Sequence, residues 1–594
     1  MEQEVAGAAP VSHPKRAGEE SNDSMADTQE IPLPKAPEPG GEPVAEPKTV
    51  STPLELSKPV AQLLDSYTGW LTRPKPSRTP IHVDEIASKV AKIYELIRKV
   101  VDWKEDNVLR RSATERILKR LLFGKLSGIS RSSKSSPSYI AETVTTELIR
   151  GGHLPNDTIP QEVLPILSKN IEKYLAFLSV TNLPATNNVV TARHNYTTFI
   201  VELAACEIED LLAQPRLEYD LLDAMTRAML ERITVTPEGS LTKDEIYIQT
   251  YISVARTLFD LDDAFIIYRL LTFQYSDFSN PSPETLRQLQ ADMPSIWDQS
   301  EMLLNTVAGK QFYAISEQTD TVFALLGDVL RKYSDKPEKI MPIFTSREDL
   351  QKEIEVAYDV RYKSLKKRLF ILGFFSTLSV FASNWFTFFL IEVPAAHIFG
   401  EGFNAFTTFI DFIVPTVVMF ILVSIIKAPG PANKQNVTTA IFDFVKKTES
   451  FSMYEIKLNR PRRPILHSVM ALIYMAIMFT VLGCIGWVFY IAGLPITSVI
   501  FDTATIAMTI FAAVTIRNKS KELTVGDKMS GIEFILDMIS VPVAKFGNLL
   551  AKTWKQYNVV AFLFNFLVET PFALIIDVIE EWSKFIKERR SDIH

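Results

Sequence analysis

The stretch SLKKRLFILGFFSTLSVFASNWFTFFLIE, from Ser364 to Glu392, decides the fold class of this chain. No charged residue interrupts it between its basic start and Glu392, and an apolar run of this length is enough for a helix to cross a bilayer. The sequence therefore predicts an integral membrane protein in which a long polar part precedes the first membrane span. Basic residues gather before and at the start of the stretch, at Arg361, Lys363, Lys366, Lys367 and Arg368.

Four segments have the length and the lack of Lys and Arg that a transmembrane helix needs. Lys and Arg are frequent before the first segment, in the loop 427–463 and after the fourth segment, and they are absent from the two short turns. Because basic loops stay on the cytoplasmic side, we expect a plasma (cell inner) membrane protein with its N-terminal domain and C-terminus in the cytoplasm. The four segments are Leu369–Ile391, Ala405–Ile426, Ile465–Ile491 and Pro495–Ile516.

The part before the first span has two compositions. Residues 1–80 are rich in Pro, Glu, Gly and Ser and poor in aromatic residues, which predicts a disordered Pro-rich tail. Residues 82–333 carry apolar residues at helical spacing and no convincing alternation of period two, which predicts a cytoplasmic helical domain. The expected fold class is therefore all-α.

A long helix is expected to connect the helical domain to the membrane. Ser346 and Asp349 have nearly the spacing of a capping box, and no breaker follows them until Pro394. We expect a charged stalk helix over 346–368 that continues directly into a four-helix transmembrane domain over 369–516.

The C-terminal region, 529–594, is predicted to form amphipathic helices. In GIEFILDMISVPVAKFGNLLAKTWKQ, apolar and polar residues separate onto two faces, as in a helix that lies in the membrane interface. The segment 559–576 is apolar but contains Asn565, Glu569 and Pro571. A single further span there would move the basic tail outside. Because basic segments stay on the cytoplasmic side, a re-entrant or surface-lying segment is favoured.

Each predicted hairpin carries one carboxylate and one tryptophan at matching positions. Asp411 and Asp502 lie near the start of the second and fourth spans. An intramembrane carboxylate is a candidate ion or proton site, whereas a carboxylate close to interfacial water is simply favoured by the helix dipole. Trp385 and Trp487 lie near the outer ends of the first and third spans and are expected to be interface anchors.

Composition excludes several classes of protein. The net charge of -7 argues against a nucleic-acid partner. The two cysteines, Cys206 and Cys484, are far apart in sequence, which excludes a disulfide scaffold. We find no catalytic or nucleotide-binding signature and no pair of histidines at metal-ligand spacing. We therefore expect no enzyme activity, no cofactor and no metal.

Two regions of the chain resemble a known group of proteins. ATERILKRLLFGK (113–125) with LIRGGHLPNDTIP (148–160), and the tail FNFLVETPFALIIDVIEEWSKFIKERRSDIH (564–594), resemble uncharacterised multi-pass membrane proteins of candidate-phylum (Patescibacteria-type) bacteria. That family has no assigned activity. The resemblance implies a bacterial plasma membrane and says nothing about mechanism.

The sequence thus favours a non-enzymatic, membrane-anchored scaffold or interaction protein. Its partners would be the lipid bilayer and proteins that bind through the cytoplasmic helical domain, and a homo-oligomer is compatible with this function. The alternative is an ion channel or transporter subunit that uses Asp411 and Asp502.

Overall fold

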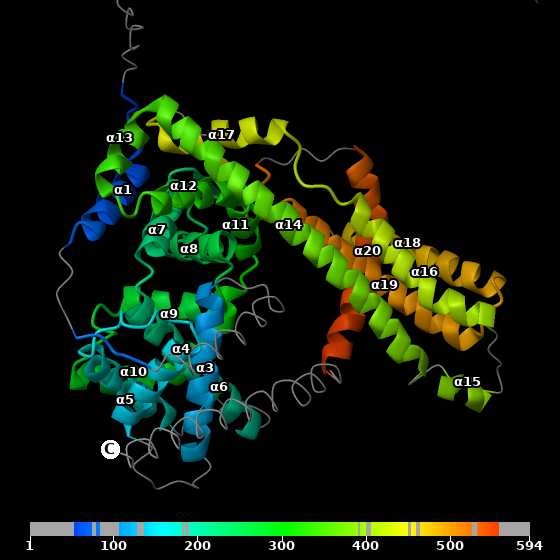
Figure 1. Ribbon diagram of the computed structural model, residues 1–594, viewed down its shortest axis with the longest axis horizontal. Helices are drawn as coiled ribbons and strands as arrows, with labels where there is room; N and C mark the ends of the chain where they lie inside the picture. Colours follow the sequence, from blue (N-terminus) through cyan, green and yellow to red (C-terminus); the bar gives the residue numbers. More distant parts are fainter. Residues whose placement is uncertain are drawn as a thin grey trace, which may run out of the picture. The chain divides into compact units, whose positions relative to one another are not determined.

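The structure is a computed structural model, drawn in Figure 1. Residues 52–594 form one compact unit, and every feature below belongs to it. The residues that the structure describes are 53–73, 79–83, 106–126, 136–180, 183, 189–389, 393–399, 405–448, 453–458, 464–525 and 531–556.

Most of the described chain is helical, as the predicted fold class requires (Figure 1). The helices before the long connecting helix are α1 (Lys58–Leu71), α3 (Asp106–Leu126), α4 (Pro137–Arg150), α5 (Val163–Leu178), α6 (Val189–Ala213), α7 (Arg216–Leu230), α8 (Lys243–Phe259), α9 (Asp263–Gln274), α10 (Pro283–Leu304), α11 (Gly309–Ser316), α12 (Asp320–Lys332), the short 3-10 helix η2 (Pro337–Lys339) and α13 (Ile340–Thr345). The later helices are α14 (Arg347–Thr387), α15 (Val393–Phe399), α16 (Ala405–Ile425), α17 (Ala432–Val445), α18 (Pro464–Ile491), α19 (Ile496–Ser520) and α20 (Gly531–Gln556).

The helices before α14 enclose a shared apolar core because each turns one apolar stripe inward. Helix α12 is an example: Val322, Leu326 and Val329 are at most 1% exposed. Gly327 lets α12 approach α7 closely, since a Cβ at this position would lie 2.6 Å from Leu221 Cδ1. The core is thus set by stripes at helical spacing, as the sequence predicted.

Helix α1 corrects the predicted extent of the disordered tail. It lies inside residues 1–80, yet it is a regular helix that packs against α7 and α13. Pro59 occupies its first turn, where proline is tolerated, and Val60, Leu64 and Tyr67 are buried on one face. The average composition of the segment hid this short apolar stripe. Residues 1–52 lie outside the described residues.

A small parallel sheet is the second difference from the expected all-helical pattern. Strand β1 (Ile233–Thr236) follows α7, and strand β2 (Tyr454–Lys457) lies in the long loop before α18. Ile233 pairs with Tyr454, and the register continues to the pair Thr236 and Lys457. Two strands so far apart in the sequence and of only four residues each leave no periodic signal for sequence analysis to find.

Helix α14 begins where the sequence predicted. Ser346 is its N-cap, and its hydroxyl accepts a hydrogen bond from the Asp349 amide at 3.3 Å. The helix continues without interruption for 41 residues and contacts α12 and α13 at its start and α16 and α19 further on (Figure 1). Its first half is no free-standing stalk, because Leu350 and Ile354 are completely buried against the neighbouring helices.

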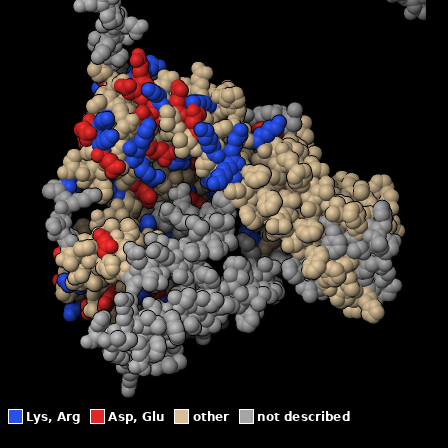
Figure 2. Space-filling model, in the orientation of Figure 1, with Lys and Arg blue, Asp and Glu red and all other residues tan. Residues whose placement is uncertain are grey.

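Three helical segments are long and apolar enough to cross a membrane: Ser468–Ile491 in α18, Ile496–Ser520 in α19 and Glu533–Lys552 in α20. The apolar segment Ile413–Ile425 of α16 is shorter. Large apolar side chains cover the outside of these helices, such as Trp487 at 64% exposure. Figure 2 shows charged side chains over the first half of α14 and the neighbouring helices, whereas the visible face over α16 and α18 has almost none. Such a contiguous apolar surface is typical of a protein in contact with lipid.

Helix α20 differs from the expected interfacial helix because it packs lengthwise along α19. Near its start, Glu533 lies 3.9 Å from Lys521 and Asp537 forms an ion pair with Arg517. Further along, a Cβ on Gly547 would lie 2.1 Å from the Ala507 carbonyl oxygen, so only glycine allows this approach. Residues later in α20 contact residues earlier in α19, so the two helices are antiparallel. The segment 559–576 lies outside the described residues.

Candidate functional site

The loop between α16 and α18 is fastened to the N-terminal helices at the end of α17. The Ser57 amide donates a hydrogen bond to Val445 O at 2.7 Å, and the Ser57 hydroxyl donates to Phe444 O at 2.7 Å. The Lys447 amide donates to Glu55 O at 2.8 Å. These hydrogen bonds fix the position of the loop, and we call this set of contacts the loop clamp.

Aromatic and cationic side chains complete the loop clamp. The Phe444 ring packs edge-on against Phe323 of α12, with ring centres 5.6 Å apart. Phe444 also contacts Arg232, whose guanidinium carbon lies 4.1 Å from the Phe444 ring centre. Arg232 Nη2 also donates to Asp443 O at 3.2 Å. The ring and the carbonyl oxygens stabilise this buried cation.

A second loop, after α19, joins the same surface. Thr321 Oγ1 on α12 donates to Glu522 O at 2.8 Å, and Asn433 Nδ2 on α17 donates to Leu523 O at 2.6 Å. Arg368 of α14 pairs with the Glu522 carboxylate at 2.7 Å. The N-terminal helices, the loop with α17 and the loop after α19 therefore meet in one place.

Within the apolar helices, α19 buries a polar stripe. Ser498, Asp502, Thr505 and Thr509 are at most 9% exposed, and their spacing of three or four residues puts them on one face of the helix. The Thr509 hydroxyl donates to Thr505 O at 2.8 Å. Asp502 itself is completely buried, so it does not have the water-facing position of a simple interfacial carboxylate.

Asp411 lies on α16, which packs against α19. Its neighbours Ile410 and Val414 pack against a small apolar cluster that includes Ile506, one turn beyond Asp502. The two aspartates therefore occupy the same level of two adjacent helices. The side chain of Asp411 lies outside the described part, so the structure gives no distance between the two carboxylates.

The two tryptophans point outward from the apolar helices. Trp385 on α14 is 49% exposed and Trp487 on α18 is 64% exposed. Trp385 also packs against Phe389, with ring centres 4.9 Å apart. Exposed tryptophans near helix ends are typical of residues at a membrane interface.

Sequence analysis missed a buried ionic network on α6. Lys173 Nζ on α5 lies 2.8 Å from Glu207 Oε1 and 2.6 Å from Oε2, and both residues are at most 3% exposed. Lys173 also donates to the Phe278 carbonyl oxygen, and the Tyr174 hydroxyl donates to Glu207 Oε2. The signal was present in FIVELAACEIEDLLA (199–213), where carboxylates interrupt an apolar run, because a charge at a core position needs a partner.

Two neighbouring carboxylates on α6 have raised pKa values. Burial raises the pKa of Glu209 to about 7, although the Arg111 and Arg110 guanidinium groups oppose the shift. Burial, together with repulsion from Glu115, raises the pKa of Glu202 to about 7. Glu209 is buried in the interior of the domain, whereas Glu202 is only partly buried.

The described residues contain no group of three or more His, Cys, Asp or Glu side chains that could hold a metal ion. We find no family model that matches the chain, and comparison with curated proteins and with solved structures also gives no match. Function must therefore be argued from the loop clamp, the polar stripe and the apolar helices alone.

Proposed function

We propose that this chain is a multi-pass plasma membrane protein whose cytoplasmic helical domain is a non-enzymatic scaffold, fixed to the membrane bundle for binding of other proteins. In this arrangement the second half of α14, α16, α18 and α19 cross the bilayer as two hairpins, and α20 crosses it again antiparallel to α19. The first half of α14 connects them to the domain.

The loop clamp is the observation that carries this proposal. The helical domain, the loop with α17 and the loop after α19 touch one another, so they share one side of the membrane. The chain between any two of these regions must then cross the bilayer an even number of times. This requirement supports α18 with α19 as one hairpin and α14 with α16 as another. The basic residues of both loops agree with a cytoplasmic side.

A domain held in this way differs from one on a flexible tether. Hydrogen bonds from both loops fix its orientation relative to the bilayer, so it would present a constant face to its partners. The end of α10 and the turn after it offer such a face, because Met302 is 68% exposed and Val307 is 80% exposed. Exposed apolar side chains that lie together are typical of binding surfaces.

Affinity purification from native membranes, followed by mass spectrometry, tests the scaffold function. The full chain should retain specific protein partners, and Met302→Asp with Val307→Asp should lose at least one of them. The control is Ile166→Asp, which places the same charge at an apolar residue that is 50% exposed on α5. Equal partner sets for all three proteins would contradict the assignment of this face, and an absence of any partner would contradict the scaffold.

The complete burial of Asp502 supports a second candidate function. A carboxylate enclosed by membrane helices must be protonated, paired or bound to a cation, and hydroxyl-bearing residues occupy the same face of α19. This arrangement suits an ion or proton pathway. Ion flux into vesicles that contain only the purified chain, abolished by Asp502→Asn, would favour this function over the scaffold.

A further inference from the structure

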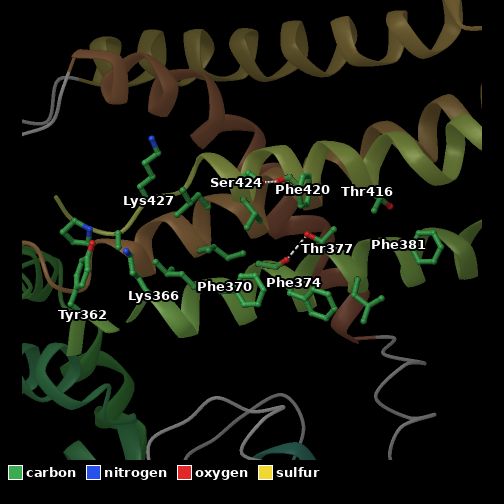
Figure 3. A pocket seen from close by; sticks show the side chains of 18 of the residues that line it. Tyr362, Lys366, Phe370, Phe374, Thr377, Phe381, Thr416, Phe420, Ser424 and Lys427 are labelled. Atoms are coloured by element: carbon green, nitrogen blue, oxygen red, sulfur yellow. Dashed lines mark hydrogen bonds between the residues drawn. The ribbon is translucent and has the colours of Figure 1, made fainter. Parts of the chain in front are cut away.

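A groove runs between α14 and α16, with a volume of about 840 Å³. Figure 3 shows Lys366, Lys427 and Tyr362 at one end of it and Phe381 and Thr416 at the other. The two helices lie close together at Gly373, where a Cβ would lie 2.3 Å from Val423 Cγ1. The groove therefore lies beside a close contact between the two helices.

The end at Lys366 and Lys427 is cationic. Lys366 Nζ lies 5.2 Å from the Tyr362 ring centre. Other cations on α14 and α17 are neutralised: Arg361 pairs with Asp328, and Lys434 lies 3.0 Å from Asp359. In the described part of the chain neither Lys366 nor Lys427 has an acidic partner, and no acidic residue lines the groove. Two positive charges at one mouth thus remain available to an anion.

Beyond the mouth the lining is apolar. Phe370, Phe374 and Phe420 are each more than half exposed. The two hydroxyls shown with dashed lines in Figure 3 are satisfied within their own helices, because Thr377 donates to Gly373 O at 2.8 Å and Ser424 donates to Phe420 O at 2.7 Å. The groove therefore presents hydrocarbon surface, which suits an acyl chain and not a polar solute.

The length of the groove corresponds to one leaflet. From Phe370 to Phe381 a helix rises about 16 Å at 1.5 Å per residue, and one leaflet provides about half of the ~30 Å hydrocarbon core. The cationic mouth would then lie at the level of the phosphates on the cytoplasmic side, where basic pockets between membrane helices bind anionic head groups.

We propose that this groove binds one anionic phospholipid of the cytoplasmic leaflet. Its phosphate lies between Lys366 and Lys427, and one acyl chain lies against Phe370, Phe374 and Phe420. The inference rests on the membrane arrangement proposed above, in which α14 and α16 cross the bilayer. It adds a defined lipid site to the general contact between the protein and the membrane.

Native mass spectrometry of the purified full-length protein tests the site. The probes are phosphatidylglycerol and phosphatidylcholine with identical acyl chains. We expect phosphatidylglycerol to bind at least about tenfold more tightly, because each of the two lysines attracts its anionic head group. Lys366→Gln with Lys427→Gln should remove this preference. Lys363→Gln with Lys367→Gln changes the net charge equally outside the groove lining and should retain it.

A second pair of variants tests the acyl-chain part without changing charge. Ser424→Trp fills the groove and should prevent binding of both lipids. Val417→Trp adds the same side chain at a residue of α16 that is 44% exposed and does not line the groove, so it should bind as the wild type does. Equal binding of the two lipids by the wild type would overturn the proposal. It would also be overturned if the double lysine variant in the groove and its control, or Ser424→Trp and Val417→Trp, lost lipid binding equally.

Extraction with alkaline carbonate separates this inference from the proposed function. Release of the full chain from native membranes would contradict the membrane arrangement itself. A chain that stays in the membrane fraction but shows no preference for phosphatidylglycerol would overturn the lipid site alone.

Discussion

Arg232 and Phe444 connect the helices before α14 with the loop that contains α17: the Arg232 guanidinium carbon lies 4.1 Å from the Phe444 ring centre. Arg232 directly precedes β1, and Phe444 lies in the last turn of α17. Arg232 also donates to Ala228 O at 2.8 Å, so this one side chain connects the end of α7 with α17.

Replacement of Arg232 by Met should loosen the loop clamp. The change removes the cation–π contact and two hydrogen bonds to carbonyl oxygens, with an expected cost of about 2 kcal/mol. Limited digestion with chymotrypsin should then cut the loop between α17 and α18 faster than in the wild type. Arg227→Met, at an arginine that is half exposed, is the control and should leave the rate unchanged. Equal rates for both variants would contradict the role given to Arg232.

Cysteine labelling with an impermeant reagent should report the proposed topology. In a background that lacks Cys206 and Cys484, a cysteine at His397 in α15 should react from outside. A cysteine at Asn436 in α17 should react only after permeabilisation, because the loop clamp holds it on the side of the helical domain. Labelling of position 436 in intact cells would contradict the even number of crossings.

The same method decides the course of α20. Its antiparallel packing along α19 and its apolar length predict that its C-terminal end, probed at Gln556, reacts from outside. The basic tail should still be protected at Arg590, since the charge rule keeps it in the cytoplasm and the apolar segment 559–576 is long enough to return. Protection of position 556 would mean that α20 stays at the inner surface.

Asp502→Asn should reveal an ion or proton site, if the polar stripe forms one. The melting temperature of the wild type in detergent should then change with Na⁺, K⁺, Ca²⁺ or pH, and the variant should lose that change. A bound ion at a hundredfold excess over its Kd stabilises the protein by about 2.7 kcal/mol. Asp298→Asn, at an exposed position on α10, is the control. Identical responses from all proteins would remove the support for an ion pathway.

Lys173→Met should strongly destabilise the helical domain. The variant leaves the Glu207 carboxylate buried without its cation, and breaking a buried pair in this way costs about 3–5 kcal/mol. Adding Glu207→Gln should recover part of the loss because the uncompensated charge is removed. Denaturant or thermal melts of the full chain measure both effects, with the exposed Lys169→Met as the control. A double variant less stable than Lys173→Met would contradict this account.

Glu202 should make the free energy of unfolding depend on pH. Its pKa is raised to about 7 in the folded chain from an ordinary value of 4.5. The folded chain therefore keeps this proton where the unfolded chain has lost it, and stability falls as the pH rises from about 4.5 to about 7. Glu202→Gln should melt a few degrees above the wild type at pH 8, for about 1 kcal/mol after solvent screening, and should show little difference at pH 4. The exposed Glu238→Gln should show neither effect.

The sequence by itself determined the features that depend on a single segment. The capping residues Ser346 and Asp349 and the uncharged runs in α18 and α19 are local, because helix formation and transfer into lipid depend on neighbouring residues. The basic residues of the loops are equally local. These signals were sufficient for the helical class and for membrane association.

Only the tertiary structure decided which distant segments meet. Composition placed Ser57 in a disordered tail, but its bonds to Phe444 and Val445 depend on a loop nearly four hundred residues further on. The burial of Asp502 and the groove at Gly373 likewise arise from how helices pack. Contacts of this kind leave no periodicity within either partner, because each segment is stabilised by surface that the other supplies.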